Sequence, residues 1–327
     1  MNLTEYKRRL FNDISQSEFE ELSLMAFRYQ FENNIVYRQY CDYRRIKADS
    51  ICEFDKIPFL PISFYKTGKI ISTESTCYTI FESSSTTGNI TSKHYVSDIE
   101  LYERAFFETF NLFYGDPGNY VLLALLPSYL ERKNSSLVYM VNSLLKRSRP
   151  GGGFYLNNLE KLRVKIFDLE NKKSRYILFG VSFALLDFAL KYSINCDHGI
   201  IMETGGMKGR RKEIIRDELH KILSDSFGVS VIHSEYGMTE MLSQAYSRAD
   251  GLFECPPWMK VLVRETSDPL TINHTGIGAL NIIDLANINS CCFIETSDLG
   301  SVKPDGSFTV SGRFDFAEVR GCNLMSG

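Results

Sequence analysis

Residues 231–243 read V-I-H-S-E-Y-G-M-T-E-M-L-S, and this stretch decides how the rest of the chain is interpreted. A β-branched run leads into a turn at Tyr236 and Gly237, and Met238 then opens an amphipathic stretch. Thr239 and Glu240 place a hydroxyl and a carboxylate side by side just past this turn, at the end of a strand. A hydroxyl can hold a phosphate oxygen, and a carboxylate can hold a divalent cation such as Mg²⁺. The stretch therefore predicts a phosphate and metal site.

A second polar stretch lies far upstream, where residues 83–92 read S-S-S-T-T-G-N-I-T-S. It joins two short predicted strands at 78–82 and 93–96, and its hydroxyls can offer several donors to a triphosphate. It is not the common phosphate loop G-x-x-x-x-G-K-[ST], because both the spacing and the lysine are missing. The alternative is a merely hydrophilic hairpin tip.

The middle of the chain alternates short apolar runs with helical segments, which predicts a mostly parallel α/β sheet covered on both faces. The expected strands are 121–126, 176–179, 199–202 and 229–233, and the expected helices are 135–147, 182–191 and 211–226. Ligands bind beyond the carboxyl ends of such strands. Glu203-Thr204-Gly205-Gly206 and residues 236–240 both fall there.

The two ends of the chain differ from this middle part. Residues 1–50 have a helical pattern, and after about residue 250 short strands alternate with Gly, Pro, Asn and Asp turns. We therefore expect two regions. Residues 1–250 form an α/β region with an N-terminal helical layer over 1–50, and residues 251–327 form a β-rich lobe.

Composition excludes several classes of protein. The 327 residues are 44% hydrophobic and 24% charged, with a formal net charge of -3 and no stripe of Lys and Arg, so no nucleic-acid partner is expected. No run reaches the ~18 apolar residues that a membrane span needs. Eight cysteines lack metal-type spacing, and the N-terminus lacks the apolar core of a signal peptide. We expect a cytoplasmic protein with free thiols.

Several motifs together resemble the adenylate-forming enzymes, a superfamily of acyl-CoA synthetases, adenylation domains and luciferases. Tyr236 to Glu240 matches the pentapeptide Y-G-x-T-E. S-S-S-T-T-G resembles the phosphate loop S-S-G-T-T-G, although Ser85 replaces a glycine and the lysine that usually follows is absent. The further matches, in family order, are the double glycine Gly205-Gly206, T-S-D-L-G at 296–300 (T-G-D-x-G) and G-R-F-D at 312–315 (G-R-x-D).

This resemblance implies ATP and Mg²⁺ as cofactors and gives each matched residue a role. Thr239 contacts the AMP phosphate, Glu240 holds Mg²⁺, the backbone of the double glycine lies against adenine, and Asp298 and Arg313 bind the ribose. The implied ATP- and AMP-binding residues are Ser83, Ser84, Ser85, Thr86, Thr87, Gly88, Gly205, Gly206, Tyr236, Gly237, Asp298 and Arg313.

Other segments resemble the acyl-protein synthetase family, known from the fatty-acid reductase complex of luminous bacteria. They are residues 58–61, 81–88, 92–98, 203–206 and 320–325. The resemblance implies the large N-terminal portion of an adenylate-forming enzyme without its mobile C-terminal lid domain. It also implies activation of a carboxylic or fatty acid to acyl-AMP and transfer of the acyl group to Cys322 in the C-terminal tail. A reductase-like or acyltransferase protein would be the partner.

Two alternatives remain open for the function, and two histidines are further candidates for the site. The acceptor thiol could belong to coenzyme A or a carrier protein, or the chain could be a non-catalytic nucleotide-binding subunit, as Ser85 and the missing lysine suggest. His94 and His233 are candidates for the acyl pocket, and a structural histidine on a strand is the alternative for His94. Thr239, Glu240 and Cys322 are the predicted catalytic residues.

Overall fold

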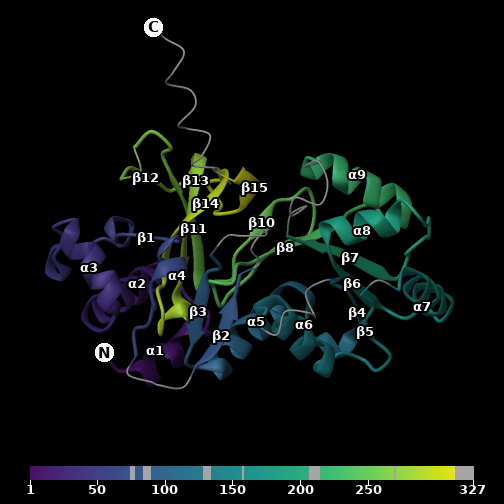
Figure 1. Ribbon diagram of the computed structural model, residues 1–327, viewed down its shortest axis with the longest axis horizontal. Coiled ribbons are helices and arrows are strands. Elements are labelled where there is room, and N and C mark those ends of the chain that lie inside the picture. Colours follow the sequence, from purple (N-terminus) through teal and green to yellow (C-terminus); the bar gives the residue numbers. More distant parts are fainter. Residues whose placement is uncertain are drawn as a thin grey trace, which may run out of the picture.

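A large twisted sheet runs through the molecule (Figure 1). The computed structural model describes residues 1–73, 78–83, 90–127, 134–156, 158–205, 214–268 and 270–313. Within these ranges, thirteen strands join one sheet in the order β12-β11-β13-β14-β15-β10-β9-β8-β7-β6-β4-β5, with β1 paired to β14, and β2 and β3 form a separate ribbon.

The parallel half of the sheet consists of buried apolar strands. They are β4 (Val121–Leu125), β5 (Gly153–Phe154), β6 (Tyr176–Val181), β7 (Gly199–Thr204) and β8 (His233–Tyr236). All side chains of β4 and β6 are buried, as expected for strands covered on both faces. Their carboxyl ends lie at one edge of the sheet, so β7 and β8 bring Thr204 and Tyr236 to the same edge.

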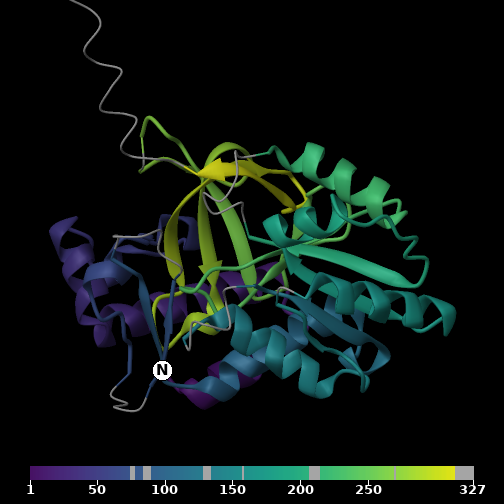
Figure 2. The same cartoon turned by 45° about the vertical axis from the view of Figure 1, so that its right-hand side comes forward.

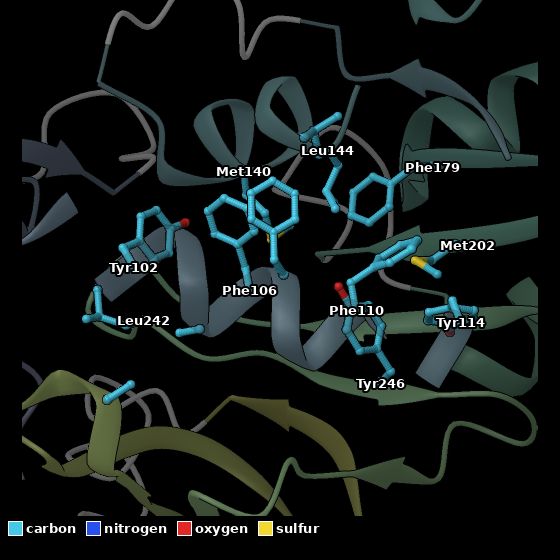
Figure 3. Close-up of a cluster of buried hydrophobic side chains, with 14 of the residues drawn as sticks. Tyr102, Phe106, Phe110, Tyr114, Met140, Leu144, Phe179, Met202, Leu242 and Tyr246 are labelled. Carbon is cyan, nitrogen blue, oxygen red and sulfur yellow. The ribbon is translucent and has the colours of Figure 1, made fainter. Parts of the chain in front are cut away.

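Helices cover both faces of this half. In Figure 1, α5 and α6 lie on one side of the parallel strands and α8 and α9 on the other. The helices are α5 (Ile99–Tyr114), α6 (Ser136–Arg147), α7 (Leu159–Asn171), α8 (Ser182–Ala189) and α9 (Arg216–Phe227). Figure 3 shows aromatic side chains of α5, among them Phe106 and Phe110, reaching toward Phe179 of β6 and Met202 of β7. This apolar contact holds the helical layer against the sheet.

The antiparallel half is built from the last third of the chain. Its strands are β9 (Ala245–Ser247), β10 (Phe253–Glu254), β11 (Met259–Arg264), β12 (Ile272–Asn273), β13 (Gly276–Asp284), β14 (Phe293–Val302) and β15 (Phe308–Arg313). The β14–β15 register shifts between Leu299 and Gly300, next to the pair formed by Asp298 and Arg313. Such a bulge redirects the side chains beside it.

The N-terminal helices α1 (Leu3–Leu10), α2 (Gln16–Asn33) and α3 (Ile35–Tyr43) pack beside the antiparallel strands, away from α7, α8 and α9 (Figure 2). They are followed by β1 (Leu60–Pro61), α4 (Phe64–Thr67), β2 (Thr79–Glu82) and β3 (Lys93–Val96). Gln30 of α2 donates to the carbonyls of Asn287 and Ile288 at 3.1 and 3.0 Å, and accepts from the Cys292 amide at 3.0 Å. The helical layer is thus bonded to the segment between β13 and β14.

The predicted fold class is confirmed, whereas several local predictions need correction. The spacing of Ser17 and Glu20 predicts a capping box, whereas Ser15 and Glu18 form the one that begins α2. Helix α5 is capped by Asp98, which accepts from the Leu101 amide. The strand expected at 229–233 is β8 at His233–Tyr236, so it leads directly into the turn, and no helix follows it.

Two further findings concern the helices of the described residues. Helix α7 was not predicted from the sequence, although Leu162, Ile166 and Leu169 are buried along one face of it. Among the described residues, no helix combines the length and apolarity required to cross a membrane.

Candidate functional site

Tyr236 is the last residue of β8, and its side-chain hydroxyl makes the first hydrogen bond of the candidate site. Its hydroxyl donates to Oδ2 of Asp298 at 2.7 Å, and Nε of Arg313 donates to Oδ1 of the same carboxylate at 3.0 Å. Asp298 and Tyr236 are buried, whereas the Arg313 side chain is 74% exposed. Burial and the neighbouring carboxylate raise the pKa of Tyr236 well above its ordinary value, so the phenol stays a donor. The sheet thus joins the Y-G-x-T-E turn to both predicted ribose residues.

Asp298 keeps unused hydrogen-bond acceptor capacity despite these two contacts. An ionised carboxylate offers about four lone-pair sites. Tyr236 and Arg313 use one on each oxygen, so a diol can still donate to both. The charge of Asp298 in turn raises the pKa of Arg313, which keeps the guanidinium charged.

Gly237 permits the sharp turn that follows Tyr236. A Cβ atom at this position would lie 2.6 Å from Oε1 of Glu235 and 3.4 Å from the side chain of Gln244. Oε1 of Gln244 is buried and has no hydrogen-bond partner in the part of the chain that the structure describes. A ligand donor placed beside this turn would have an acceptor there.

Glu240 is a buried carboxylate at the base of the predicted phosphate loop. It is 5% exposed, and burial raises its pKa, while a hydrogen bond from Ser92 and the charge of Arg313 oppose the shift. Ser92 pairs with Ser83: the Ser83 amide donates to the Ser92 carbonyl at 3.0 Å, and the Ser92 amide donates to Oγ of Ser83 at 2.9 Å. The two ends of the serine-threonine stretch therefore meet beside Glu240.

A histidine and an asparagine hold the backbone of the Thr239–Glu240 turn. Nδ1 of His94 lies 2.8 Å from the Thr239 carbonyl, and Nδ2 of Asn287 donates to the Glu240 carbonyl at 2.8 Å and to the Cys291 carbonyl at 2.9 Å. These two bonds orient Oδ1 of Asn287 toward Nε2 of His94, 3.1 Å away. Both ring nitrogens therefore face oxygen acceptors.

His94 is neutral in this position. Burial lowers its pKa to about 4, against the two hydrogen bonds, which raise it. A neutral imidazole carries one N–H, so at any moment it donates either to the Thr239 carbonyl or to Oδ1 of Asn287.

Asp284 anchors the residues after the turn. Its Oδ2 accepts from the amides of Leu242 and Ser243 at 2.8 and 2.9 Å, and its Oδ1 accepts from the Ser243 hydroxyl at 2.6 Å. This arrangement keeps the amphipathic stretch after the turn out of a helix, because its backbone donors are taken up by a carboxylate from another strand.

Gly205 follows β7 with φ +68°, a left-handed conformation that favours glycine. The residues before it form a second polar cluster. The Ser182 hydroxyl donates to the Gly205 carbonyl and, at 2.7 Å, to Glu203, which lies 3.3 Å from Nε of Arg216. The Thr204 hydroxyl donates to Glu235. Burial, with the charge of Glu203, raises the pKa of Glu235 to about 7.

His233 lies at the beginning of β8, at the opposite end of this strand from Tyr236, and Nδ1 is 3.1 Å from the Tyr114 hydroxyl. Burial lowers its pKa to about 4. His94 contacts the turn instead, so the two histidines occupy different places. Whether either lines an acyl pocket stays a prediction.

Seven predicted residues lie outside the described ranges: Ser84, Ser85, Thr86, Thr87, Gly88, Gly206 and Cys322. The structure brings together Ser83, Tyr236, Gly237, Thr239, Glu240, Asp298 and Arg313, along with His94. Sequence reasoning missed Asn287, Asp284 and Glu235. An Asn or Asp between strands is an ordinary turn residue, so no signal marked the first two, whereas Glu235 directly precedes the pentapeptide.

The donor set suits Mg²⁺ held mainly by a substrate. Within the described ranges, no group of three His, Cys, Asp or Glu side chains is arranged to hold a metal ion. Mg²⁺ is commonly bound by one or two carboxylates together with substrate phosphates and waters. A single buried Glu240 beside a hydroxyl-rich loop fits that pattern.

Comparison with known proteins agrees with this geometry. No protein-family model matches the chain. A long-chain-fatty-acid–luciferin-component ligase of Aliivibrio fischeri is 25% identical over 98% of this chain and 96% of its own length. The enzyme of the same name from Vibrio harveyi is 21% identical over 91% of this chain and 84% of its own length.

Solved structures share the fold. An ATP-bound chimera of RpMatB and BxBclM has a TM-score of 0.54 at 18% identity, over 72% of this chain and 47% of that one. A long-chain-fatty-acid-CoA ligase from Archaeoglobus fulgidus has a TM-score of 0.50 at 13% identity, over 73% and 52%. The chain thus spans about half the length of these structures. The resemblance, the fold class and the prediction of a ligase of the adenylate-forming class are confirmed.

Proposed function

We propose that this chain activates a carboxylic acid of the long-chain fatty class with ATP, giving acyl-AMP and pyrophosphate, and then passes the acyl group to a cysteine thiol. One observation carries the proposal. The base of the serine-threonine loop, the Thr239–Glu240 turn and the Asp298–Arg313 pair, which are remote in sequence, are joined through Ser92 and Tyr236. The names of the curated relatives support a fatty acid as the substrate class.

The residues of the turn would act on the phosphates of ATP. The Thr239 hydroxyl donates to the α-phosphate while the carboxylate of the acid attacks phosphorus, and pyrophosphate leaves with the electrons of the broken P–O bond. Mg²⁺ held by Glu240 would supply positive charge to the phosphate oxygens. A buried carboxylate with a raised pKa gains most from a bound cation, because the cation removes the cost of its buried charge.

The residues on β14 and β15 would hold the nucleoside. Asp298 accepts from both ribose hydroxyls with its remaining lone pairs, and Arg313 adds a donor at the exposed rim. The backbone around Gly205 would lie against adenine. These contacts retain acyl-AMP after pyrophosphate has left, and they are the same in substrate and product, so they serve binding more than the chemical step.

The proposed acyl acceptor is Cys322, by resemblance to the acyl-protein synthetases. Its thiolate would attack the carbonyl carbon of acyl-AMP, the bond from that carbon to the phosphate oxygen would break, and AMP would leave with the electron pair. A thioester remains reactive, so a partner protein with reductase or acyltransferase activity could take the acyl group onward.

The activation step is tested by ATP–pyrophosphate exchange with a panel of carboxylic acids of increasing chain length. We expect exchange that depends on a long-chain acid and on Mg²⁺. Asp298→Ala should lower kcat/KM for ATP by about 10- to 100-fold, because a charged hydrogen-bond acceptor is lost. ATP binding without exchange for any acid would contradict the proposal and favour a non-catalytic nucleotide-binding subunit.

The transfer step needs a separate measurement. Cys322→Ala should leave pyrophosphate exchange intact and abolish covalent labelling of the protein by radioactive acid and ATP. Cys52→Ala, at an exposed free cysteine, is the matched control and should label normally. Labelling that survives in the Cys322 variant would remove this residue from the role, and thioester formation that requires added coenzyme A would identify the acceptor as coenzyme A.

A further inference from the structure

A basic groove lies beside strand β3, next to the base of the serine-threonine stretch, from which Ile90 and Thr91 contribute to its lining. Its volume is about 560 Å³, and its lining comes from two short segments at 65–69 and 90–95. The lining residues are Tyr65, Lys66, Thr67, Gly68, Lys69, Ile90, Thr91, Lys93 and Tyr95. Three of these side chains are cationic and none is acidic.

Strand β3 separates this groove from the adenylate site. Side chains of a strand alternate between its two faces. Lys93 and Tyr95 line the groove, whereas His94 between them is buried and contacts the Thr239 carbonyl on the other face. Strand β3 thus turns Lys93 and Tyr95 toward the groove and His94 toward the site, while Tyr65 of the groove lining packs edge-on against the His94 ring, with 5.8 Å between the ring centres.

The lysines of the groove are weakly neutralised. Lys93 lies 3.7 Å from Glu82, and both side chains are substantially exposed, so solvent screens this pair. Nζ of Lys69 lies 4.3 Å from the ring centre of Tyr78 and 5.4 Å from that of Tyr95. Aromatic faces hold an ammonium in place without removing its charge. Lys66 and Lys69 form no ion pair with any carboxylate that the structure describes.

We infer that this groove is a second anion site, which takes a phosphate-bearing small molecule. Ammonium groups are compact point charges that bind phosphate, and the hydroxyls of Thr67 and Thr91 add donors. With Tyr65 and Ile90 its main apolar lining residues, the groove offers little surface for an acyl chain. Two sources of such a ligand fit the proposed reaction: free pyrophosphate leaving the adenylate site, and the phosphates of coenzyme A.

The experiment compares charge-neutralised variants of the full chain by equilibrium titration with inorganic pyrophosphate, coenzyme A and dephospho-coenzyme A. Lys66→Gln, Lys69→Gln and Lys93→Gln are combined in one variant. The matched control combines Lys161→Gln, Lys172→Gln and Lys191→Gln, three exposed lysines in or just after α7 and α8, so both variants have the same net charge. Figure 1 shows these two helices away from β3.

The groove variant should bind its ligand about tenfold more weakly, and the control should change by less than about twofold. Replacing the same three lysines by arginine should restore binding. A loss confined to pyrophosphate identifies the free product as the ligand, whereas a loss for coenzyme A that is smaller for the dephosphorylated form identifies the 3′-phosphate.

Equal affinity in the two Gln variants, or no binding of any probe to the unmodified chain, overturns the inference. Lys66→Gln alone provides a second test should the triple variant fail to fold. These titrations measure binding and need no turnover. They therefore test anion binding in the groove even when no acid supports pyrophosphate exchange.

Discussion

Glu235 combines deep burial with a carboxylate that titrates near neutral pH. It directly precedes Tyr236, and the Thr204 hydroxyl and nearby Glu203 determine its surroundings. Desolvation is the largest cause of the shift, and the like charge of Glu203 adds to it. A protonated Glu235 can coexist with an ionised Glu203, whereas two buried carboxylates would repel each other.

The first prediction concerns the pH dependence of stability. Folding raises the pKa of Glu235 to about 7, from about 4.3 in an unfolded chain. The folded state therefore retains a proton that the unfolded state releases. Stability should fall as pH rises from about 4.3 to about 7 and change no further from this source. Glu235→Gln should flatten that dependence and stabilise the protein by roughly 3 kcal/mol at about pH 8.

Urea unfolding between about pH 5 and about pH 8 measures this effect, within the range where Glu235 titrates. Glu218→Gln on the exposed surface of α9 is the control and should leave the pH profile unchanged. A profile for the Glu235 variant that still falls with the unmodified slope would contradict the pKa assigned to this residue.

A second prediction at this scale concerns His94 as a positioning residue. His94→Phe keeps the ring volume but leaves the Thr239 carbonyl without its donor, at a cost of about 1–3 kcal/mol. We expect a lower kcat for pyrophosphate exchange, because the turn that carries Thr239 and Glu240 is no longer fixed, and partial rescue in His94→Gln. His274→Ala, at an exposed histidine, should leave the rate unchanged. A His94→Phe variant that loses stability but keeps kcat would limit the residue to a structural role.

At the scale of elements, the β14–β15 hairpin aligns the ribose residues. Gly300 lies beside the bulge, and a Cβ atom there would be 1.9 Å from the carbonyl oxygen of Thr309 on the partner strand. A Cβ on Gly312 of β15 would meet nothing within 4 Å. The two glycines therefore offer a matched pair within one hairpin.

Gly300→Ala should destabilise the protein by about 1–3 kcal/mol and raise the KM for ATP, because the strands must separate beside Asp298 and Arg313. Gly312→Ala should change both quantities little. Denaturant unfolding and ATP-dependent exchange rates check the pair, and equal behaviour of the two variants would show that close backbone approach at Gly300 is unimportant.

Helices and strands were predictable where the local sequence pattern fits only one type of secondary structure. The strand expected at 121–126 is β4, and the helix expected at 135–147 is α6. Helix α7 had a readable signal in the spacing of Leu162, Ile166 and Leu169, and was missed. The amphipathic stretch after Met238 is not a helix, because Asp284 supplies the hydrogen bonds that a helix would have formed within itself.

At the scale of the whole molecule, the N-terminal layer supports a site to which it contributes no ligand. Gln30 bonds to Asn287, Ile288 and Cys292, and Asn287 in turn donates to the Glu240 carbonyl. The Tyr6 hydroxyl adds a donor to the Leu285 carbonyl at 3.0 Å. The helices thus hold the segment on which the turn rests.

Gln30→Ala should therefore destabilise the protein by about 2–3 kcal/mol, since it leaves the Ile288 carbonyl and the Cys292 amide unpaired, while the Asn287 carbonyl keeps the Ser290 amide as a donor. It should also lower the rate of pyrophosphate exchange. Gln39→Ala, at an exposed position on α3, should change stability by less than about 0.5 kcal/mol. Thermal unfolding and exchange rates check both variants. If the Gln30 variant is destabilised but its exchange rate is unchanged, the helical layer does not support the catalytic function of the site.

The sequence by itself determined the α/β class and the order of the motifs, and it predicted roles for Thr239, Glu240, Asp298 and Arg313, because hydrophobic periodicity and side-chain type are local properties. Only the tertiary structure decided that Tyr236 bonds to Asp298, that Ser92 brings the loop base to Glu240, and that His94 and Asn287 hold the turn. These contacts join residues up to 193 positions apart, as between His94 and Asn287. Their geometry depends on strand order and register, which no short window of sequence encodes.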